Sequence, residues 1–205
     1  SGTRKDIQVY DIVIIGGGID LSVGAMVSMS NAILVTLILP EAQAGGILFG
    51  IAVTLLAGLA AGAFNGLCVA YLRLQPIVTT YATSFVYAGI ALLILPRPGG
   101  NLPREFLRSY RGTPLGIPMS VYFIVLAVLF WLLLRSTRYG QFLFATGGKP
   151  EAAYTTGVNV NFMRFTTYVW AGLFSALAAL ALTMNVGTGN PRIGDAMTLD
   201  SIVAV

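Results

Sequence analysis

Three consecutive glycines at positions 16–18, followed by Asp20, form the segment with the clearest potential for ligand chemistry. Residues 10–15 before them are mostly apolar, so the segment could be a strand that enters the glycine turn of a flavin-binding Rossmann domain. That turn needs the spacing Gly-x-Gly-x-x-Gly, and Leu21 stands where the third glycine is required. Asp20 would also place a negative charge beside the pyrophosphate at the start of the helix. A flavin-binding fragment therefore remains only an alternative interpretation.

Asp20 has a second interpretation, as part of a helix start at membrane depth. The glycines allow irregular backbone, and either Asp20 or Ser22 can cap the amides of a helix that we expect to run through Leu39. A carboxylate this close to an apolar segment is costly unless it is capped or hydrated. We therefore hold open two roles for it, a functional group or a simple cap.

The elements around this segment follow from composition and from the placement of charge. Hydrophobic residues make up 56% of the 205 positions and charged residues 10%, whereas soluble domains carry about 25% charged residues. The uncharged windows are residues 21–40, 42–72, 74–96, 112–134 and 165–191. Each is long enough for a membrane helix, which needs roughly 20 residues, and none alternates as barrel strands do. The sequence predicts an all-α, polytopic helical membrane protein with about five transmembrane helices in one domain over residues 1–205.

The same composition argues against several classes of function. The net charge of +4 comes from arginines at window edges, which suits loop anchoring better than nucleic-acid binding. Cys68 is a single cysteine and there is no histidine, so neither a disulfide nor a metal site built on these residues is expected. With no acid inside a window, ion-coupled transport is also disfavoured. We expect a transport subunit without catalytic residues, cofactor or metal.

Small and polar residues in the second and third windows suggest how the helices pack. Gly58, Gly62 and Gly66 share one helix face at four-residue spacing, which favours close helix packing. Asn65 and Gln75 could either line a pore or form interhelical hydrogen bonds. Aromatic residues near window ends are expected at the lipid headgroups; they are Tyr71, Trp131, Tyr139, Tyr168 and Trp170.

Several short motifs resemble one family in the order in which that family carries them. They lie at residues 17–24, 62–66, 75–79, 115–118, 137–140, 145–153 and 157–160. The first, Gly-Gly-Ile-Asp-Leu-Ser-Val-Gly, is similar to the signature of ABC sugar permeases of the ribose, xylose and galactose type. Departures include Gln141 in place of Arg and Lys149 in place of Asn, which leave the sugar undefined. Related branched-chain amino acid permeases are an alternative.

The resemblance implies a permease subunit that moves a monosaccharide across the bacterial inner membrane. Its implied partners are a second permease copy, a cytoplasmic ABC ATPase, a periplasmic sugar-binding protein and the lipid bilayer, with no nucleic acid. The sequence contains no Gly-x-x-x-x-Gly-Lys-Ser/Thr loop, so a partner would hydrolyse ATP. Complete members are longer at both ends, and we expect this chain to be truncated. The candidate substrate path comprises Asp20, Asn65, Gln75 and Thr79.

The polar loop at residues 139–164 holds a candidate for contact with the ATPase. Pro150, Glu151, Ala152 and Ala153 suit the first turn of a short helix that ends at Gly157. By resemblance this is a cytoplasmic coupling helix; without it, the segment is a capped loop helix. Lys and Arg counts are equal, at four each, in the loops at residues 96–111 and 135–164. Charge alone therefore leaves the orientation open.

Overall fold

The computed structural model describes residues 19–100, 102–103, 106–108, 119–148 and 157–198, and these residues are almost wholly helical. Their helices, in chain order, are α2 (Val23–Leu37), α3 (Ala44–Gly66), α4 (Pro76–Ile94), α6 (Met119–Ser136), α7 (Arg138–Gly148) and α9 (Val160–Val186). A π-helical turn, Leu67–Tyr71, extends α3. The described residues contain one isolated β-bridge, between Gly99 and Gly189. The prediction of an all-α protein is confirmed.

Local sequence explains where two of the long helices begin. Gln75 is extended and Pro76 follows as the first residue of α4, where its missing N–H costs no hydrogen bond. At α9 the side chain of Asn159 accepts a hydrogen bond from the Phe162 amide at 3.1 Å and so caps the first turn. Helix α9 therefore begins five residues before the apolar window at residue 165.

The number of full membrane spans differs from the prediction. Each of the five windows contains a helix, but only Ala44–Tyr71, Pro76–Ile94 and Val160–Val186 are individually long and apolar enough to cross a membrane. The α6 and α7 helices, bent by 87° at their junction, make a fourth candidate if they count as one span. Helix α2 has 15 residues, short of the roughly 20 that a span needs. The described chain thus has three or up to four candidate spans, which agrees with a polytopic helical membrane protein, against about five transmembrane helices expected from sequence.

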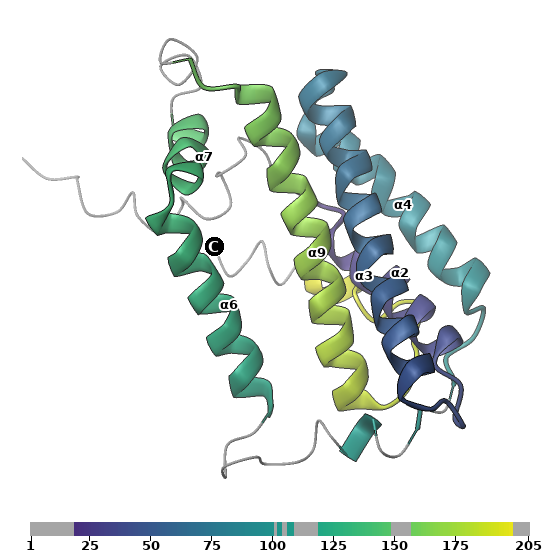
Figure 1. The fold of residues 1–205 in the computed structure, drawn as a ribbon. Helices are drawn as coiled ribbons and strands as arrows, with labels where there is room; N and C mark the ends of the chain where they lie inside the picture. Colours follow the sequence, from purple (N-terminus) through teal and green to yellow (C-terminus); the bar gives the residue numbers. More distant parts are fainter. Residues whose placement is uncertain (1–18, 101, 104–105, 109–118, 149–156, 199–205) are drawn as a thin grey trace, which may run out of the picture.

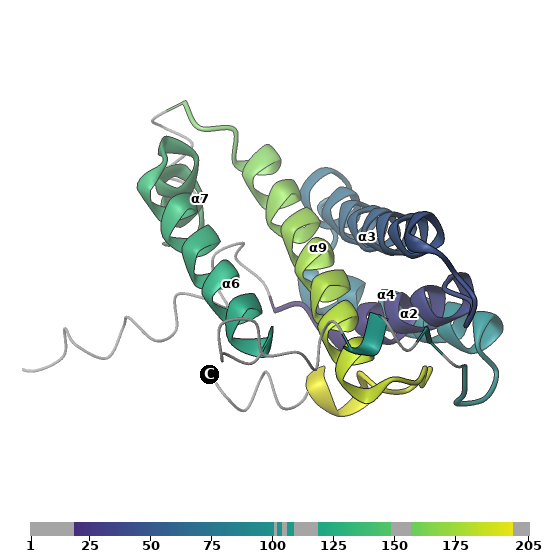
Figure 2. The same ribbon diagram turned by 60° about the horizontal axis from the view of Figure 1, so that its bottom comes forward.

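Helix α2 is short because it is the centre of the bundle. Eleven of its 15 residues are buried, and it packs against α3, α4 and α9. Figures 1 and 2 show α9 between the helices α2, α3 and α4 on one side and the α6–α7 pair on the other. Irregular backbone at membrane depth is tolerated where protein surrounds it. The chain at the start of α2, where Ser22 is fully buried, can therefore be irregular inside the bundle.

The glycines of α3 lie where α3 crosses α9. A Cβ atom at Gly62 would collide with the Tyr168 carbonyl, and one at Gly172 would collide with the Gly58 carbonyl. At Gly66 a Cβ atom would come within 2.8 Å of the Phe165 carbonyl. The two backbones are close enough that no larger residue fits at these positions, as expected for small-residue helix packing.

Helix α7 occupies part of the segment expected to be a polar loop. Leu143 of α7 packs against Val158 and Met163 in a small buried cluster beside the start of α9. The α7 sequence ends in Thr-Gly-Gly, which favours helix only weakly. Tertiary contact with α9 therefore supports a helix that local propensity does not predict.

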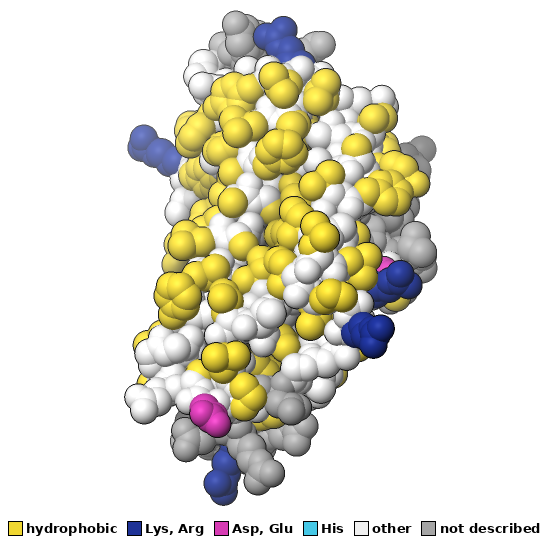
Figure 3. All heavy atoms as spheres, turned by 90° about the vertical axis from the view of Figure 1, so that its right-hand side faces the viewer, with side chains coloured by type: hydrophobic (Ala, Val, Ile, Leu, Met, Phe, Trp, Pro, Cys, Tyr) yellow, Lys and Arg dark blue, Asp and Glu magenta, His cyan; other side chains and the backbone are white. Residues whose placement is uncertain are grey.

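The outer flank of the bundle is apolar. Figure 3 shows hydrophobic side chains across the middle of one face, with charged side chains toward its ends and margins. The large exposed residues include Leu56 on α3 and Phe85 on α4. Leu93, also on α4, is 82% exposed. Such a surface suits lipid rather than water.

Candidate functional site

The most polar site inside the bundle begins at Asp20, just before α2. One carboxylate oxygen, Oδ1, accepts hydrogen bonds from the Ser22 amide at 2.9 Å and from the Ser22 hydroxyl at 2.6 Å. The other oxygen, Oδ2, is buried and has no hydrogen-bond partner among the described residues. Because an unpaired buried acceptor is costly, this oxygen is available for a bound group.

The hydrogen bonds continue from Ser22 to α3 and α4. The Asn65 side-chain amide donates to the Ser22 hydroxyl at 2.8 Å. The Tyr87 hydroxyl lies 3.0 Å from Asn65 Oδ1 and 2.9 Å from the Ala61 carbonyl, so it can donate to either. Asn65 is fully buried. A continuous polar chain, Asp20–Ser22–Asn65–Tyr87, thus joins three elements; we call it the α2-entry cluster.

Thr80 holds the backbone of this cluster in place. Its hydroxyl accepts from the Leu21 amide at 3.1 Å and donates to the Pro76 carbonyl of its own helix at 2.9 Å. Since Thr80 is fully buried, these bonds fasten the segment before α2 to α4. Tyr87 and Thr80 were not among the candidate residues from sequence, because hydroxyl residues inside apolar helices have no local pattern that marks them, and Ser22 was expected only as a possible cap.

The four predicted substrate-path residues fall into two groups. Asp20 and Asn65 meet through Ser22 in the α2-entry cluster. Gln75 is exposed at the start of α4, and the Thr79 hydroxyl donates to its carbonyl at 2.9 Å. Among the described residues, no hydrogen bond joins Gln75 or Thr79 to the cluster.

The capping role expected of Asp20 or Ser22 is not what the structure contains. Ser22 occupies the N-cap position of α2 without a side-chain capping bond, since its hydroxyl donates to Asp20 instead. The Gly24 amide in the first turn donates to the Thr198 hydroxyl at 3.1 Å. A residue 174 positions away thus takes the place of a local cap, which local sequence cannot reveal.

A second buried polar group joins the middle of α2 to α9 and to the chain after it. The Asn31 side-chain amide donates to the Thr183 hydroxyl at 2.6 Å, and its carbonyl oxygen accepts from the Asn190 amide at 2.7 Å. The Ser28 hydroxyl accepts from the Gly194 amide at 2.9 Å. These bonds fasten residues 190–194 against α2. Sequence reasoning did not identify them, because their partners are more than 150 positions apart.

Tyr168 was expected at the lipid headgroups, and this expectation was wrong. Its side chain is 3% exposed, and its hydroxyl is buried without a hydrogen-bond partner among the residues that the structure describes. Tyr168 therefore belongs to the interior of the bundle, because α9 turns this side chain inward. Tyr71, by contrast, is 50% exposed.

The segment that was predicted to contact an ATPase is described only in part. Pro150, Glu151, Ala152 and Ala153 lie outside the described residues. Gly157 has φ +81°, the left-handed conformation that favours glycine, and no atom of the described residues lies within 4 Å of a Cβ placed there. This conformation fits a residue that ends a helix. The helix that it would end stays a prediction.

The site presents hydrogen-bonding groups rather than reactive ones. Its chemistry consists of a carboxylate, an amide and hydroxyls, which suit the hydroxyl groups of a polar solute. In the part of the chain that the structure describes, no group of three or more His, Cys, Asp or Glu side chains could hold a metal ion. Such groups form hydrogen bonds and need no covalent step to do so.

Comparison with known proteins decides the family. Residues 10–205 match the family described as branched-chain amino acid transport system / permease component. The chain belongs to this permease family. The Rossmann alternative is contradicted, because the match begins at residue 10 and the helix after Asp20 packs among α3, α4 and α9 rather than on a sheet.

Individual relatives are import permeases of bacteria. The chain is 35% identical over 197 residues to ribose import permease protein RbsC of Bacillus subtilis (strain 168), covering 94% of this chain and 60% of the relative. It is 32% identical over 202 residues to autoinducer 2 import system permease protein LsrD of Enterobacter sp. (strain 638), with 94% and 61% covered. RbsC of Escherichia coli (strain K12) is 30% identical over 200 residues, with 95% and 61% covered.

These matches bear on the extent and location of the protein. The chain spans about 60% of the length of the curated relatives that it matches. No solved structure gave a significant match. Family membership and several apolar helices agree with the predicted location, the bacterial inner membrane, and with a transport subunit that is not an enzyme.

Proposed function

We propose that the chain is the membrane-spanning permease part of an ATP-driven importer that carries a monosaccharide or a similar polyhydroxylated solute across the bacterial inner membrane. Relatives named for the import of ribose and of autoinducer 2 support this substrate class over branched-chain amino acids. The α2-entry cluster carries the proposal, because it places a carboxylate oxygen without a partner among apolar helices. Ionisable residues at such depth mark solute pathways by default.

Asp20 and Asn65 are the proposed contacts for the solute. Asp20 Oδ2 would accept a hydrogen bond from a solute hydroxyl, while Oδ1 remains held by Ser22. Asn65 would respond to this contact because its amide bonds the same serine. Gln75 and Thr79, at the start of α4, would meet the solute at the end of its path.

The energy for transport would come from a separate ATPase. The loop at residues 139–164, with Pro150, Glu151, Ala152, Ala153 and Gly157, is the proposed contact surface for it. A second permease copy and a solute-binding protein on the opposite side would complete the importer. The coupling helix itself rests on sequence resemblance.

The resemblance to the sugar permeases supports a cytoplasmic position for that loop. The ends of α3 and α6 and the start of α9 lie at one end of the bundle in Figure 1. In the proposed orientation this end faces the cytoplasm. Arginines stand on both sides, with Arg135 and Arg138 at the α6–α7 junction and Arg97 and Arg108 after the end of α4, so charge does not set the orientation.

Uptake of labelled ribose by cells that express the complete importer tests the proposal. Asp20→Asn should reduce uptake at least tenfold at an unchanged amount of protein in the membrane. The matched control, Ser84→Ala, removes an exposed hydroxyl that bonds only within α4 and should leave uptake unchanged. Inhibition of uptake by leucine but not by pentoses would favour the amino acid alternative.

A further inference from the structure

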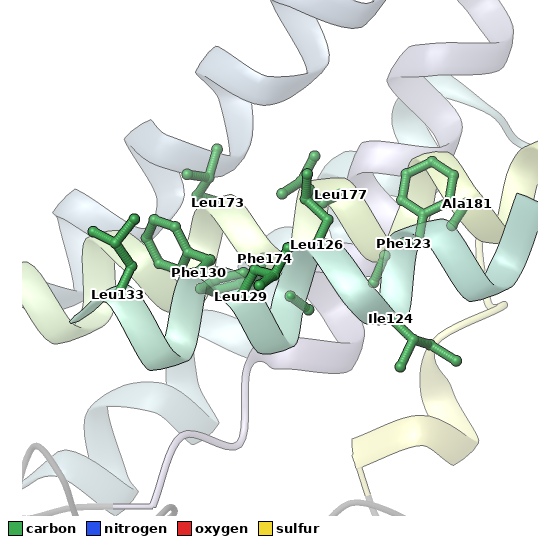
Figure 4. A pocket seen from close by; sticks show the side chains of 12 residues that line it. Phe123, Ile124, Leu126, Leu129, Phe130, Leu133, Leu173, Phe174, Leu177 and Ala181 are labelled. Carbon is green, nitrogen blue, oxygen red and sulfur yellow. The ribbon is translucent and has the colours of Figure 1, made fainter. Parts of the chain in front are cut away.

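A cavity of about 550 Å³ lies between α6 and α9, away from the α2-entry cluster (Figure 4). Its volume is within the range of small-molecule sites, roughly 300–1,000 Å³. The twelve side chains that line it are all apolar, with Phe123 and Leu133 toward opposite ends and Leu177 between them on α9. The cavity therefore suits a hydrocarbon ligand and offers nothing to a sugar.

The cavity opens toward the surroundings along α6. Leu126 is 60% exposed and Leu133 is 65% exposed, although both line the cavity. Behind them, aromatic rings join the two helices: the Phe130 ring centroid lies 5.3 Å from that of Phe174 and 5.0 Å from that of Trp170. A helix, with a diameter of about 10–12 Å, cannot pass between helices whose rings touch. A single extended hydrocarbon chain can lie over these rings.

Polar and basic groups stand at one end of the cavity. Helix α6 ends at Ser136, one residue after Arg135, and α7 begins at Arg138. The Arg135 guanidinium lies 5.4 Å from the centre of the Trp131 ring. Both arginines are exposed, and α6, α7 and α9 contain no acidic residue that could neutralise them.

Hydrogen bonds close the same end of the cavity between α7 and α9. The Tyr139 hydroxyl donates to the Thr166 hydroxyl at 2.5 Å and accepts from Trp170 Nε1 at 3.2 Å. The lining thus changes from hydrocarbon to hydrogen-bonding groups and guanidinium groups within about one helical turn, roughly 5.4 Å, beyond Leu133. Along the cavity, an apolar stretch is thus followed by aromatic side chains and then by positive charge. This order matches an amphiphile with a hydrocarbon chain and an anionic headgroup.

We propose that the cavity between α6 and α9 binds an acyl chain of an anionic phospholipid, whose phosphate lies beside Arg135 and Arg138. Basic pockets between membrane helices recognise anionic headgroups by charge, while the chain gains from burial against apolar side chains. Helix α7 begins at Arg138, three positions after Arg135, and is bent by 87° from α6 at this junction. This site is independent of the transported solute.

Quenching of tryptophan fluorescence by brominated lipids tests the site directly. Trp131 and Trp170 are the two tryptophans of the chain, and Trp131→Phe leaves Trp170, whose ring lies against that of the cavity residue Phe130, as the single tryptophan. The chain is reconstituted in phosphatidylcholine vesicles with increasing fractions of brominated phosphatidylglycerol, or with brominated phosphatidylcholine. We expect phosphatidylglycerol to quench at a several-fold lower fraction, and each of Arg135→Gln and Arg138→Gln to reduce the preference roughly fivefold.

Substitutions that fill the cavity separate the site from ordinary contact with bulk lipid. Ala178→Phe, and independently Ala127→Leu, place extra atoms in the cavity and should weaken quenching by phosphatidylglycerol. Matched controls are Leu93→Phe on the exposed face of α4 and Arg97→Gln at the opposite end of the bundle, which should leave quenching unchanged. Circular dichroism confirms that each variant keeps its helices.

Three outcomes would overturn the proposal. Equal quenching by the two lipids means bulk contact without a charge-selective site. Unchanged quenching in both cavity-filling variants places the lipid elsewhere. Absence of quenching by either lipid means that protein, such as a second copy of the chain, covers the cavity.

Discussion

Asn65 of α3 donates its side-chain amide to the hydroxyl of Ser22 at 2.8 Å, across 43 positions of sequence. Ser22 in turn donates to Asp20, and Tyr87 of α4 reaches the carbonyl oxygen of the same amide. The amide therefore links the acidic residue before α2 to the two helices beside it. Its removal should affect both the stability of the bundle and the position of the acid.

Asn65→Leu should destabilise the protein and reduce transport together. It removes the hydrogen bonds of the amide to the hydroxyls of Ser22 and Tyr87, which keep their bonds to Asp20 and to the Ala61 carbonyl, and each lost bond costs about 0.5–1.5 kcal/mol. Thermal unfolding in detergent and solute uptake in cells measure the two effects. Ser84→Ala, which removes one exposed hydroxyl of α4, is the control. Wild-type stability in Asn65→Leu would contradict the structural role of the amide.

Gly172→Ala tests the contact between α3 and α9. The added methyl group collides with the Gly58 carbonyl and the Gly62 backbone, so the helices must separate. Overpacking of this kind costs about 1–3 kcal/mol. Gly89→Ala on α4 adds the same methyl group with no atom within 4 Å and should be neutral or stabilising. Equal midpoints of thermal unfolding for the two variants would show that the crossing is looser than described.

Two substitutions of Gly157 distinguish the effect of backbone conformation from that of an added side chain in the proposed coupling loop. Gly157→Ala should uncouple ATP hydrolysis from uptake in the complete importer, since alanine disfavours the left-handed conformation by about 1–2 kcal/mol. Gly157→Asn should retain more coupling, because asparagine adopts this conformation more readily. The ratio of solute imported to ATP hydrolysed is the measurement.

Glu151 provides a second test of the proposed coupling loop. Glu151→Ala should raise the amount of ATP hydrolysed per imported solute while the amount of permease in the membrane stays normal. If both Glu151→Ala and Gly157→Ala import solute with the wild-type ratio, the loop does not couple to the ATPase.

Single cysteines at the two ends of α4 test the orientation. In a Cys68→Ser background, Arg97→Cys should react with an impermeant thiol reagent from outside the inner membrane. Leu72→Cys, at the opposite end and 67% exposed, should react only after the membrane is permeabilised. The reverse pattern would invert the orientation, and reaction of both from one side would exclude α4 as a span.

How much of this molecule could be read from sequence depends on how local each feature is. The apolar windows, the glycine face of α3 and the start of α4 at Pro76 follow from hydropathy, from four-residue spacing and from the fixed geometry of proline. Helix α7 escaped prediction because Leu143 is held by Val158 and Met163 rather than by strong local propensity. Helix α2 was predicted too long because hydropathy does not distinguish a buried central helix from a full span.

By itself, the sequence determined that this protein is a bundle of membrane helices with an acidic residue near the start of one of them and with a glycine face for packing. The absence of charged residues from a membrane helix and the spacing of glycines on one helix face involve residues that are close in sequence. They can therefore be recognised from the sequence alone. Only the tertiary structure decided that Asp20 meets Asn65 through Ser22, and that Thr198 bonds the first turn of α2. It also placed Tyr168 inside the bundle. These pairings depend on how whole helices pack, because a buried polar atom finds its partner wherever the chain brings one.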